Sequence, residues 1–233
     1  MDSYPESAKV KDDDGFNLLR WAMYNNSSMD LIKKILRASP EAALEDGNMK
    51  ALLHYSIDKN SSKHTIKDFL AACPELIKVT GSDGVTPLQY AMKKGASTEI
   101  FRILLNAWPE AAKMKDNEGM TLLHHGIANK APENVLEEIL SSCPEVAKQK
   151  DDRGITPLRC AINNNSSVDL IMKVFKAYPE SALEDMKMKA LLQYAIAMKF
   201  SKDDIFDIVA LCPELIQVIG SDGVTPLQYA FDK

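Results

Sequence analysis

A short frame recurs at nearly constant spacing along this 233-residue chain, and this recurrence restricts the possible folds more than any other feature. Its anchor is a glycine or, in two units, a methionine, and successive anchors lie 34 or 35 residues apart. The anchors are Gly15, Met49, Gly84, Gly119, Gly154, Met188 and Gly223. A fixed period of about 20 to 50 residues indicates an array of similar structural units that stack on one another.

A longer repetition is superimposed on the short one. The stretch NNSSMDLIKKILRASPEAALED at 25–46 returns as NNSSVDLIMKVFKAYPESALED at 164–185, and GSDGVTPLQYA occurs at 81–91 and again at 220–230. Both shifts are 139 residues, so a block of four units is duplicated. Under this frame both chain ends fall inside a unit, and we therefore expect the sequence to be a segment of a longer array.

The third unit shows what one repeat is expected to form. Gly81 to Gly84 provide the backbone freedom for a tight turn, and Thr86 is a suitable helix N-cap, which predicts a short helix over about 86–94. Ser97 is expected to cap a second, amphipathic helix that the Pro109–Glu110 pair stops or restarts. Such a unit is too small to bury its own apolar stripe, so its neighbours have to cover it.

Three of the first-helix stretches carry a family resemblance. GVTPLQYA, GITPLRCA and GMTLLHHG resemble the signature of the ankyrin repeat, and STEIFRILL resembles the second helix of that family. The resemblance spans nearly all of residues 12–233, although the family period is about 33 residues and units 1, 2 and 6 lack both residues of the Thr-Pro pair. Tetratricopeptide repeats share a period of about 34 residues, but they have two long helices and no capped Thr-Pro start.

The resemblance implies the fold class and the division of the chain. We expect an all-α, ankyrin-type α-solenoid of stacked helix-turn-helix repeats with short β-turn tips, comprising about six full repeats plus partial end repeats. The whole chain, 1–233, is predicted to be a single array. Its predicted parts are a partial repeat at 1–11, repeats at 12–45, 46–80, 81–115, 116–150, 151–184 and 185–219, and a partial repeat at 220–233.

Composition and motifs argue against several classes of function. The net charge of −5 disfavours nucleic-acid binding, which needs a clustered positive field. The N-terminus has no secretory signal, and no apolar run approaches the roughly 20 residues that span a bilayer, so no membrane insertion is expected. GSDGVT lacks the lysine of a phosphate-binding loop, and no metal-ligand or nucleophile motif occurs. We therefore expect no enzyme activity, catalytic residue, cofactor, metal or small-molecule substrate.

The cysteines and histidines are interpreted as structural. Four cysteines without a CxxC pair indicate free thiols and an intracellular, cytoplasmic protein, with the nucleus left open. Cys160, in a first helix, is expected to be the more accessible of them. His54 and His124 stand at the signature histidine position of the family, where the resemblance implies hydrogen bonds that brace the turns. The adjacent His124 and His125 point to different helix faces and do not form a metal site.

One column of the repeat is the candidate binding surface. The residue before the signature alanine is often aromatic, and aromatic side chains are enriched at binding hot spots. The predicted partner-binding residues of this column are Trp21, Tyr55, Tyr90, His125, Tyr194 and Tyr229. Arg20, Gln89, Arg159 and Gln193 are expected to form a polar rim beside it. The alternative is that the column packs between first helices with only the hydroxyl tips exposed, and we favour packing for most of its members.

The resemblance also implies a function. We expect a non-catalytic protein–protein interaction scaffold that binds an unidentified partner protein through its concave face and turn tips. The alternative is a regulatory or targeting segment of a larger enzyme, kinase or channel whose catalytic part lies outside this chain.

Overall fold

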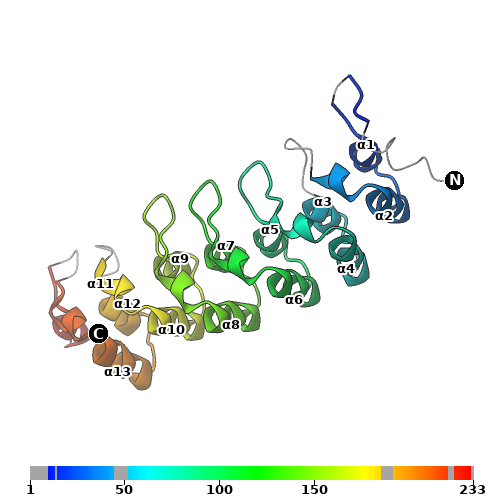
Figure 1. Cartoon of the computed structure of the whole chain (residues 1–233). Coiled ribbons are helices and arrows are strands. Elements are labelled where there is room, and N and C mark those ends of the chain that lie inside the picture. The colour runs from blue at the N-terminus through cyan, green and yellow to red at the C-terminus, as the bar shows by residue number, and fades with distance from the viewer. Residues whose placement is uncertain (1–9, 14, 45–51, 185–190, 220–222, 232–233) are drawn as a thin grey trace. The chain divides into compact units, whose positions relative to one another are not determined.

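Helices and the turns between them make up the described part of the chain (Figure 1). The computed structural model describes residues 10–13, 15–44, 52–184, 191–219 and 223–231. Within these residues it has fourteen α-helices, five short 3-10 helices and no β-strand. The prediction of an all-α fold is confirmed.

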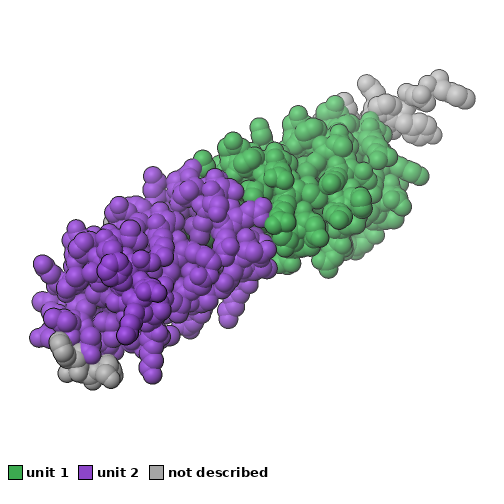
Figure 2. Space-filling model, turned by 90° about the horizontal axis from the view of Figure 1, so that it is seen from below, with its two compact units in different colours: residues 1–125 green, residues 126–233 purple. Residues whose placement is uncertain are grey.

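The chain divides into two compact units, residues 1–125 and residues 126–233 (Figure 2). Helix α7 (Leu122–Ala128) crosses the point of division. The assignment of all repeats to a single array stays a prediction. Most of its partial repeat at 1–11, and residues 220–222 and 232–233 of the other, lie outside the described residues.

Unit 1 contains three helix pairs, each followed by a short 3-10 helix. In chain order these elements are α1 (Leu18–Tyr24), α2 (Met29–Ala38), η1 (Pro40–Ala43), α3 (Leu52–Asp58), α4 (Lys63–Ala72), η2 (Pro74–Lys78), α5 (Pro87–Lys93), α6 (Thr98–Ala107) and η3 (Pro109–Lys113). The first helix of each pair has seven residues and the second has ten. The short first helix is the feature that the Thr-Pro signature predicts.

Unit 2 follows the same order of elements. It contains α8 (Glu133–Ser142), η4 (Pro144–Lys148), α9 (Pro157–Asn163), α10 (Val168–Ala177), α11 (Ser181–Glu184), α12 (Leu191–Ala197), α13 (Lys202–Leu211), η5 (Pro213–Gln217) and α14 (Pro226–Phe231). The short helix α11 stands where η1 stands in the duplicated block of unit 1.

Side-chain caps set the starts of the helices. The Thr86 hydroxyl accepts a hydrogen bond from the Gln89 backbone N–H, and the Gln89 side chain bonds back to the Thr86 N–H, which completes a capping box at α5. Ser97 caps α6 in the predicted way, accepting from the Ile100 N–H. Both predicted starts in the third repeat are confirmed.

The second helix of each repeat ends at a residue with extended backbone. Trp108, with φ −151° and ψ 82°, turns the chain out of α6, and Pro109 then begins η3 because proline cannot continue a helix. The sequence predicted a stop or a restart at this proline but not the 3-10 form. Five residues between Trp108 and the next extended residue, Met114, leave room for only one tight turn.

The helices of unit 1 form two layers. The first helix α3 packs against the next first helix α5, while the second helices pack in their own row, α2 against α4 and α4 against α6. The tip loops that precede α5 and α7 project beyond the first-helix row (Figure 1). We call the surface made by the first helices and their tip loops the first-helix face.

Apolar side chains from both rows fill the space between the layers. Phe69 from α4 and Leu88 from α5 are fully buried in unit 1, and Phe175 from α10 is fully buried in unit 2. Ion pairs join the second helices at the surface, with Lys33 Nζ 3.0 Å from Asp68 Oδ2 in unit 1. Because such exposed pairs contribute at most about 1 kcal/mol each, burial of the apolar stripes is the main stabilising term.

Candidate functional site

Polar side chains on three of the first helices hold the turn loop of the following repeat. His54 Nε2 lies 3.0 Å from the Val85 carbonyl oxygen, and Gln89 Nε2 donates to the carbonyls of Met114 at 2.8 Å and Met120 at 3.3 Å. In unit 2, Gln193 Nε2 donates to the Val224 carbonyl at 2.6 Å. The bracing role that the resemblance implied for His54 is therefore present, and glutamine performs it at two further repeats.

This clamp corrects the expectation of a polar rim at Gln89 and Gln193. Both side chains are buried, Gln89 completely. They are turned inward because each amide donates to backbone carbonyls of the following turn. In the repeat frame, Gln89 and Gln193 occupy the signature histidine position. That equivalence indicated that their side chains would point inward.

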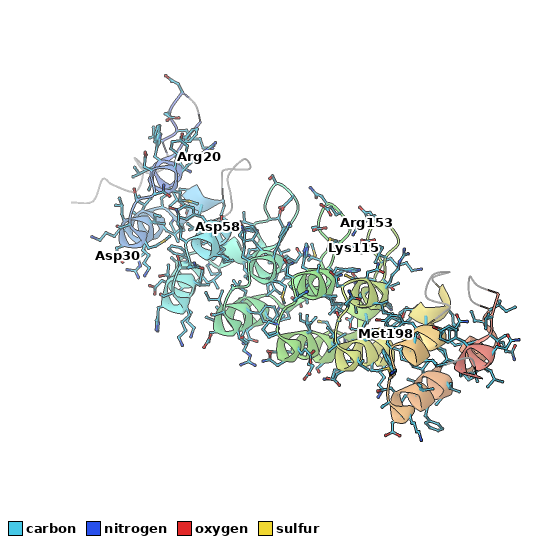
Figure 3. The ribbon with its side chains drawn as sticks, turned by 180° about the vertical axis from the view of Figure 1, so that it is seen from behind. Arg20, Asp30, Asp58, Lys115, Arg153 and Met198 are labelled. Carbon is cyan, nitrogen blue, oxygen red and sulfur yellow. The ribbon has the colours of Figure 1, made fainter. Side chains whose placement is uncertain are left out.

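The other two members of the expected rim have different environments. Arg20, labelled in Figure 3, and Arg159 are both half-buried. The Arg20 guanidinium carbon lies 3.7 Å from the centroid of the Phe16 ring, in a cation–π contact. The Arg159 backbone N–H is capped by the Thr156 hydroxyl at 3.2 Å. Partner contact by these two arginines stays a prediction.

The aromatic column is mostly packed inside the two units. Tyr55, Tyr90 and His125 are buried, Tyr194 and Tyr229 are half-buried, and Trp21 is 41% exposed. Most of these side chains therefore agree with the packing alternative, and Trp21 presents the largest accessible ring. Binding of a partner by the column stays a prediction.

Tyr90 illustrates how a column residue is held. Its hydroxyl donates to Asp58 Oδ1 at 2.6 Å, and its ring lies 4.5 Å from that of His54 between centroids. Lys94 Nζ lies 5.3 Å from the Tyr90 ring centroid and 3.3 Å from Asp58 Oδ1. Lys59 covers Tyr55 in the same way at 5.5 Å. In both cases the lysine that lies over the tyrosine ring comes four residues later in the same repeat.

His125 forms a buried pair with an acidic residue of the preceding turn. Its Nε2 lies 2.9 Å from Asp116 Oδ2, and both side chains are 4% exposed. Burial lowers the pKa of His125, although the Asp116 carboxylate opposes this shift. The adjacent His124 instead has Nδ1 2.9 Å from the Thr121 hydroxyl. The two neighbouring histidines thus face different partners, as predicted.

The cysteines are free and buried. Cys160 is the most accessible of the four, as expected, but only slightly, at 8% exposure against 2% to 5% for the others. Burial raises the pKa of the Cys160 thiol to about 11. A thiol with this pKa is almost entirely protonated near neutral pH and is a poor nucleophile.

An aromatic cluster that the sequence reasoning only partly found lies on α1. Trp21 is grouped with Phe16 and Tyr24, with ring centroids 5.5 to 6.2 Å apart. Tyr24 is 71% exposed. The Trp21 indole N–H donates to Asp12 Oδ2 at 2.6 Å, and the other oxygen of Asp12 accepts from the Phe16 N–H at 2.7 Å. The signal missed in the sequence was an aromatic side chain at position 24, where the next two repeats have Asp58 and Lys93.

Shallow grooves lie between successive helix-connecting loops. In unit 1 a groove of about 410 Å³ is lined by residues from the starts of α4 and α6, including Ser62 and Ser97, and in unit 2 a groove of about 330 Å³ has the same position between α8 and α10. The side chains in the described ranges contain no cluster of three or more His, Cys, Asp or Glu residues able to hold a metal ion. Among the helices described, none is long and apolar enough to cross a membrane.

Comparisons with known proteins identify what the chain is similar to. Residues 53–146 match the family model for ankyrin repeats, in three copies. The fold is similar to that of an ankyrin repeat domain from Acinetobacter baumannii AYE, with a TM-score of 0.58 and 20% sequence identity over 73% of this chain and 85% of that one. The comparison with curated proteins found no match.

Proposed function

We propose that this chain, which matches the ankyrin repeat family over residues 53–146 and has the all-α fold of an ankyrin repeat domain, is a non-catalytic scaffold that binds a partner protein. Ankyrin repeats are in general protein–protein interaction modules. The partner is proposed to bind the first-helix face and the turn tips.

The observation that supports this proposal best is that polar side chains brace the turns while separate aromatic side chains stay exposed. Gln89 and His54 brace the turns from inside, so they are committed to the fold. The cluster at Trp21 and Tyr24 has exposed rings on the same row of helices. A rigid row that displays exposed aromatic groups binds with little loss of conformational entropy, which favours recognition of another protein.

The four buried free thiols support a reducing, intracellular compartment as part of this proposal. Burial raises the pKa of Cys73 and Cys212 as well as that of Cys160, so these thiols are suited to packing and not to nucleophilic catalysis.

Site-specific photocrosslinking tests the proposed face. A photoreactive phenylalanine derivative is placed at Tyr24 on α1, at Glu118 in a turn tip, or at the exposed Lys34 on the second helix α2. In extract of the cell that makes the protein, the first two positions are expected to crosslink to one common partner, while Lys34 serves as the matched exposed control. Crosslinking at Lys34 without crosslinking at Tyr24 and Glu118 would contradict the proposal.

A further inference from the structure

The Trp21 cluster is the most exposed aromatic surface in the described part of unit 1. Trp21 is 41% exposed, Tyr24 is 71% exposed, and the neighbouring Leu18 is 48% exposed. Trp21 and Tyr24 meet edge to face, with an interplanar angle of 86°. Their mutual packing and the hydrogen bond from Trp21 to Asp12 hold the rings in place without covering them.

Internal comparison shows that this surface is particular to the first repeat. In the duplicated block, the residues 139 positions after Phe16, Trp21 and Tyr24 are Ile155, Cys160 and Asn163. The connecting sequence NNSS nevertheless follows both helices. The two copies therefore share the loop after the helix but differ in the aromatic groups that the helix displays.

The aromatic column of unit 1 also shows which side chains pack on such rings. At Tyr55 and Tyr90 the residue four positions later is a lysine, and its ammonium group lies over the ring at 5.5 and 5.3 Å. At Trp21 the corresponding residue is Asn25, a neutral side chain whose amide donates to the Trp21 carbonyl at 3.0 Å. The repeat that carries tryptophan, the strongest cation–π acceptor among the side chains, therefore lacks the lysine that its two neighbours have.

Two acidic residues stand at the edge of the cluster. Asp12 touches the indole N–H, and Asp13 beside it is exposed. Arg20 stacks on Phe16 at 3.7 Å, which shows that a guanidinium group fits against rings of this cluster. Carboxylates at the edge of an aromatic surface attract a positive side chain and keep its charge partly compensated.

We propose that Trp21 and Tyr24 form a docking site for one cationic side chain, arginine or lysine, in a basic segment of the partner protein. This inference rests on the proposed scaffold function, because it names the chemistry of the partner that the first-helix face recognises. The incoming cation takes the place that Lys59 and Lys94 occupy over Tyr55 and Tyr90. Cation–π attraction to the exposed indole and the charge of Asp12 and Asp13 hold it there.

The indole N–H signals of the two tryptophans give a direct readout on the full chain. Trp21 and Trp108 are the two tryptophans of the sequence, so a two-dimensional NMR spectrum has one indole signal for each. The probe is a short glycine–arginine peptide, compared with the same peptide containing citrulline, a neutral analogue of arginine. The arginine peptide is expected to shift the Trp21 signal and leave the Trp108 signal in place. Equal shifts with the citrulline peptide would overturn the proposal.

A substitution in the neighbouring helix turn sharpens the test. Asn25→Lys supplies the lysine that the repeat lacks, and this internal cation is expected to weaken binding of the arginine peptide about two- to fivefold, the range of an exposed cation–π contact. Asn164→Lys makes the same charge change at the duplicated position in unit 2 and is the matched control. Trp21→Leu is expected to weaken binding by at least a similar factor. Unchanged affinity in both Asn25→Lys and Trp21→Leu would contradict the site.

The two proposals fail in distinguishable ways. A crosslink from Tyr24 to a partner, together with no response to the arginine peptide, would overturn the cationic site and leave the scaffold function standing. The absence of any crosslink from Tyr24 and Glu118 would overturn the scaffold function itself.

Discussion

Gln89 makes three hydrogen bonds with its side-chain amide group. Its oxygen accepts from the Thr86 N–H at 2.8 Å, and its nitrogen donates to the carbonyls of Met114 and Met120. It thereby caps its own helix and also fixes the turn that begins the next repeat. His124 accepts from the Thr121 N–H at 3.3 Å at the equivalent position, so imidazole provides the same cap. At the scale of single residues, the stacking of repeats depends on these inward polar contacts as well as on apolar burial.

Removal of the Gln89 side chain is expected to destabilise the protein. Gln89→Ala removes the acceptor of the buried Thr86 N–H and the side-chain donor to the Met114 carbonyl, which costs about 1 to 3 kcal/mol in the free energy of unfolding. Gln89→His is expected to restore much of this, because His54 makes the equivalent contact. Gln228→Ala is the matched control, since Gln228 lies in the same local sequence but is exposed. Urea unfolding measures the three variants, and equal losses in Gln89→Ala and Gln228→Ala would refute the clamp.

The buried His125 side chain is expected to make stability depend on pH. Burial lowers its pKa in the folded protein below the ordinary value of about 6.5. At pH values between the lowered pKa and about 6.5, the unfolded chain binds more protons than the folded chain. The free energy of unfolding is therefore highest above this interval and falls as the pH decreases through it. His125→Gln is expected to reduce the loss of stability between about pH 7.5 and pH 5, the range that brackets the histidine pKa.

Urea unfolding at the two pH values measures this dependence. His64→Gln, at an exposed histidine on α4, is the control and is expected to leave the difference as in the unchanged protein. A His125→Gln variant that keeps the full pH dependence would show that other groups are responsible.

At the scale of elements, much of the fold follows from local sequence. The starts of α5 and α6 were predictable because Thr86 and Ser97 are strong N-caps at fixed positions. The end of α6 before Pro109 was predictable because proline cannot continue a helix. Local propensity did not predict the direction of the Gln89 side chain, because it depends on a carbonyl 31 residues away, and only its equivalence to the signature histidine position indicated it. The sequence also could not distinguish exposed from buried members of the column, since Tyr55 and Tyr90 are buried at positions equivalent to the exposed Trp21.

The loop between the two helices of a repeat stores a small backbone strain. Gly95 adopts φ 63° there, and the five equivalent positions, which have asparagine or lysine, also have positive φ. These non-glycine residues are Asn26, Asn60, Lys130, Asn165 and Lys199. Because a left-handed conformation costs a residue with a side chain about 1 to 2 kcal/mol, glycine is the better choice for the loop itself.

Lys130→Gly is therefore expected to stabilise the protein by about 0.5 kcal/mol, since relief of strain is partly offset by the greater freedom of glycine in the unfolded chain. Gly95→Ala is the reciprocal change and is expected to destabilise by about 1 kcal/mol. An added Cβ at Gly95 meets no atom within 4 Å, so this loss reports the backbone conformation and not a clash. Thermal unfolding measures both variants, and destabilisation by Lys130→Gly would contradict the strain.

At the scale of the whole molecule, the duplicated sequence shows that burial comes from neighbours. Residues 81–91 and 220–230 are identical in sequence, and they include the starts of the short first helices α5 and α14. Leu88 is fully buried, whereas the equivalent Leu227 is 61% exposed. Helix α5 packs against α3, α6 and η3, whereas the strongest contacts of α14 in the described residues are with α12 and η5. The same residues therefore contribute differently according to the helices stacked on them.

Substitution of the two leucines distinguishes the contribution of the local sequence to stability from the contribution of the stacked neighbours. Leu88→Ala removes a side chain enclosed by three elements and is expected to destabilise by about 2 to 5 kcal/mol, the range for buried leucine. Leu227→Ala removes a largely solvated side chain, and the expected loss is below about 1 kcal/mol because little apolar surface returns to water. Urea unfolding gives both values, and hydrogen exchange at α5 and α14 shows whether each loss is global or confined to its own repeat. Similar losses at both positions would mean that the eleven-residue segment contributes the same stability whichever helices pack on it. Stacking would then no longer explain why the units hold together.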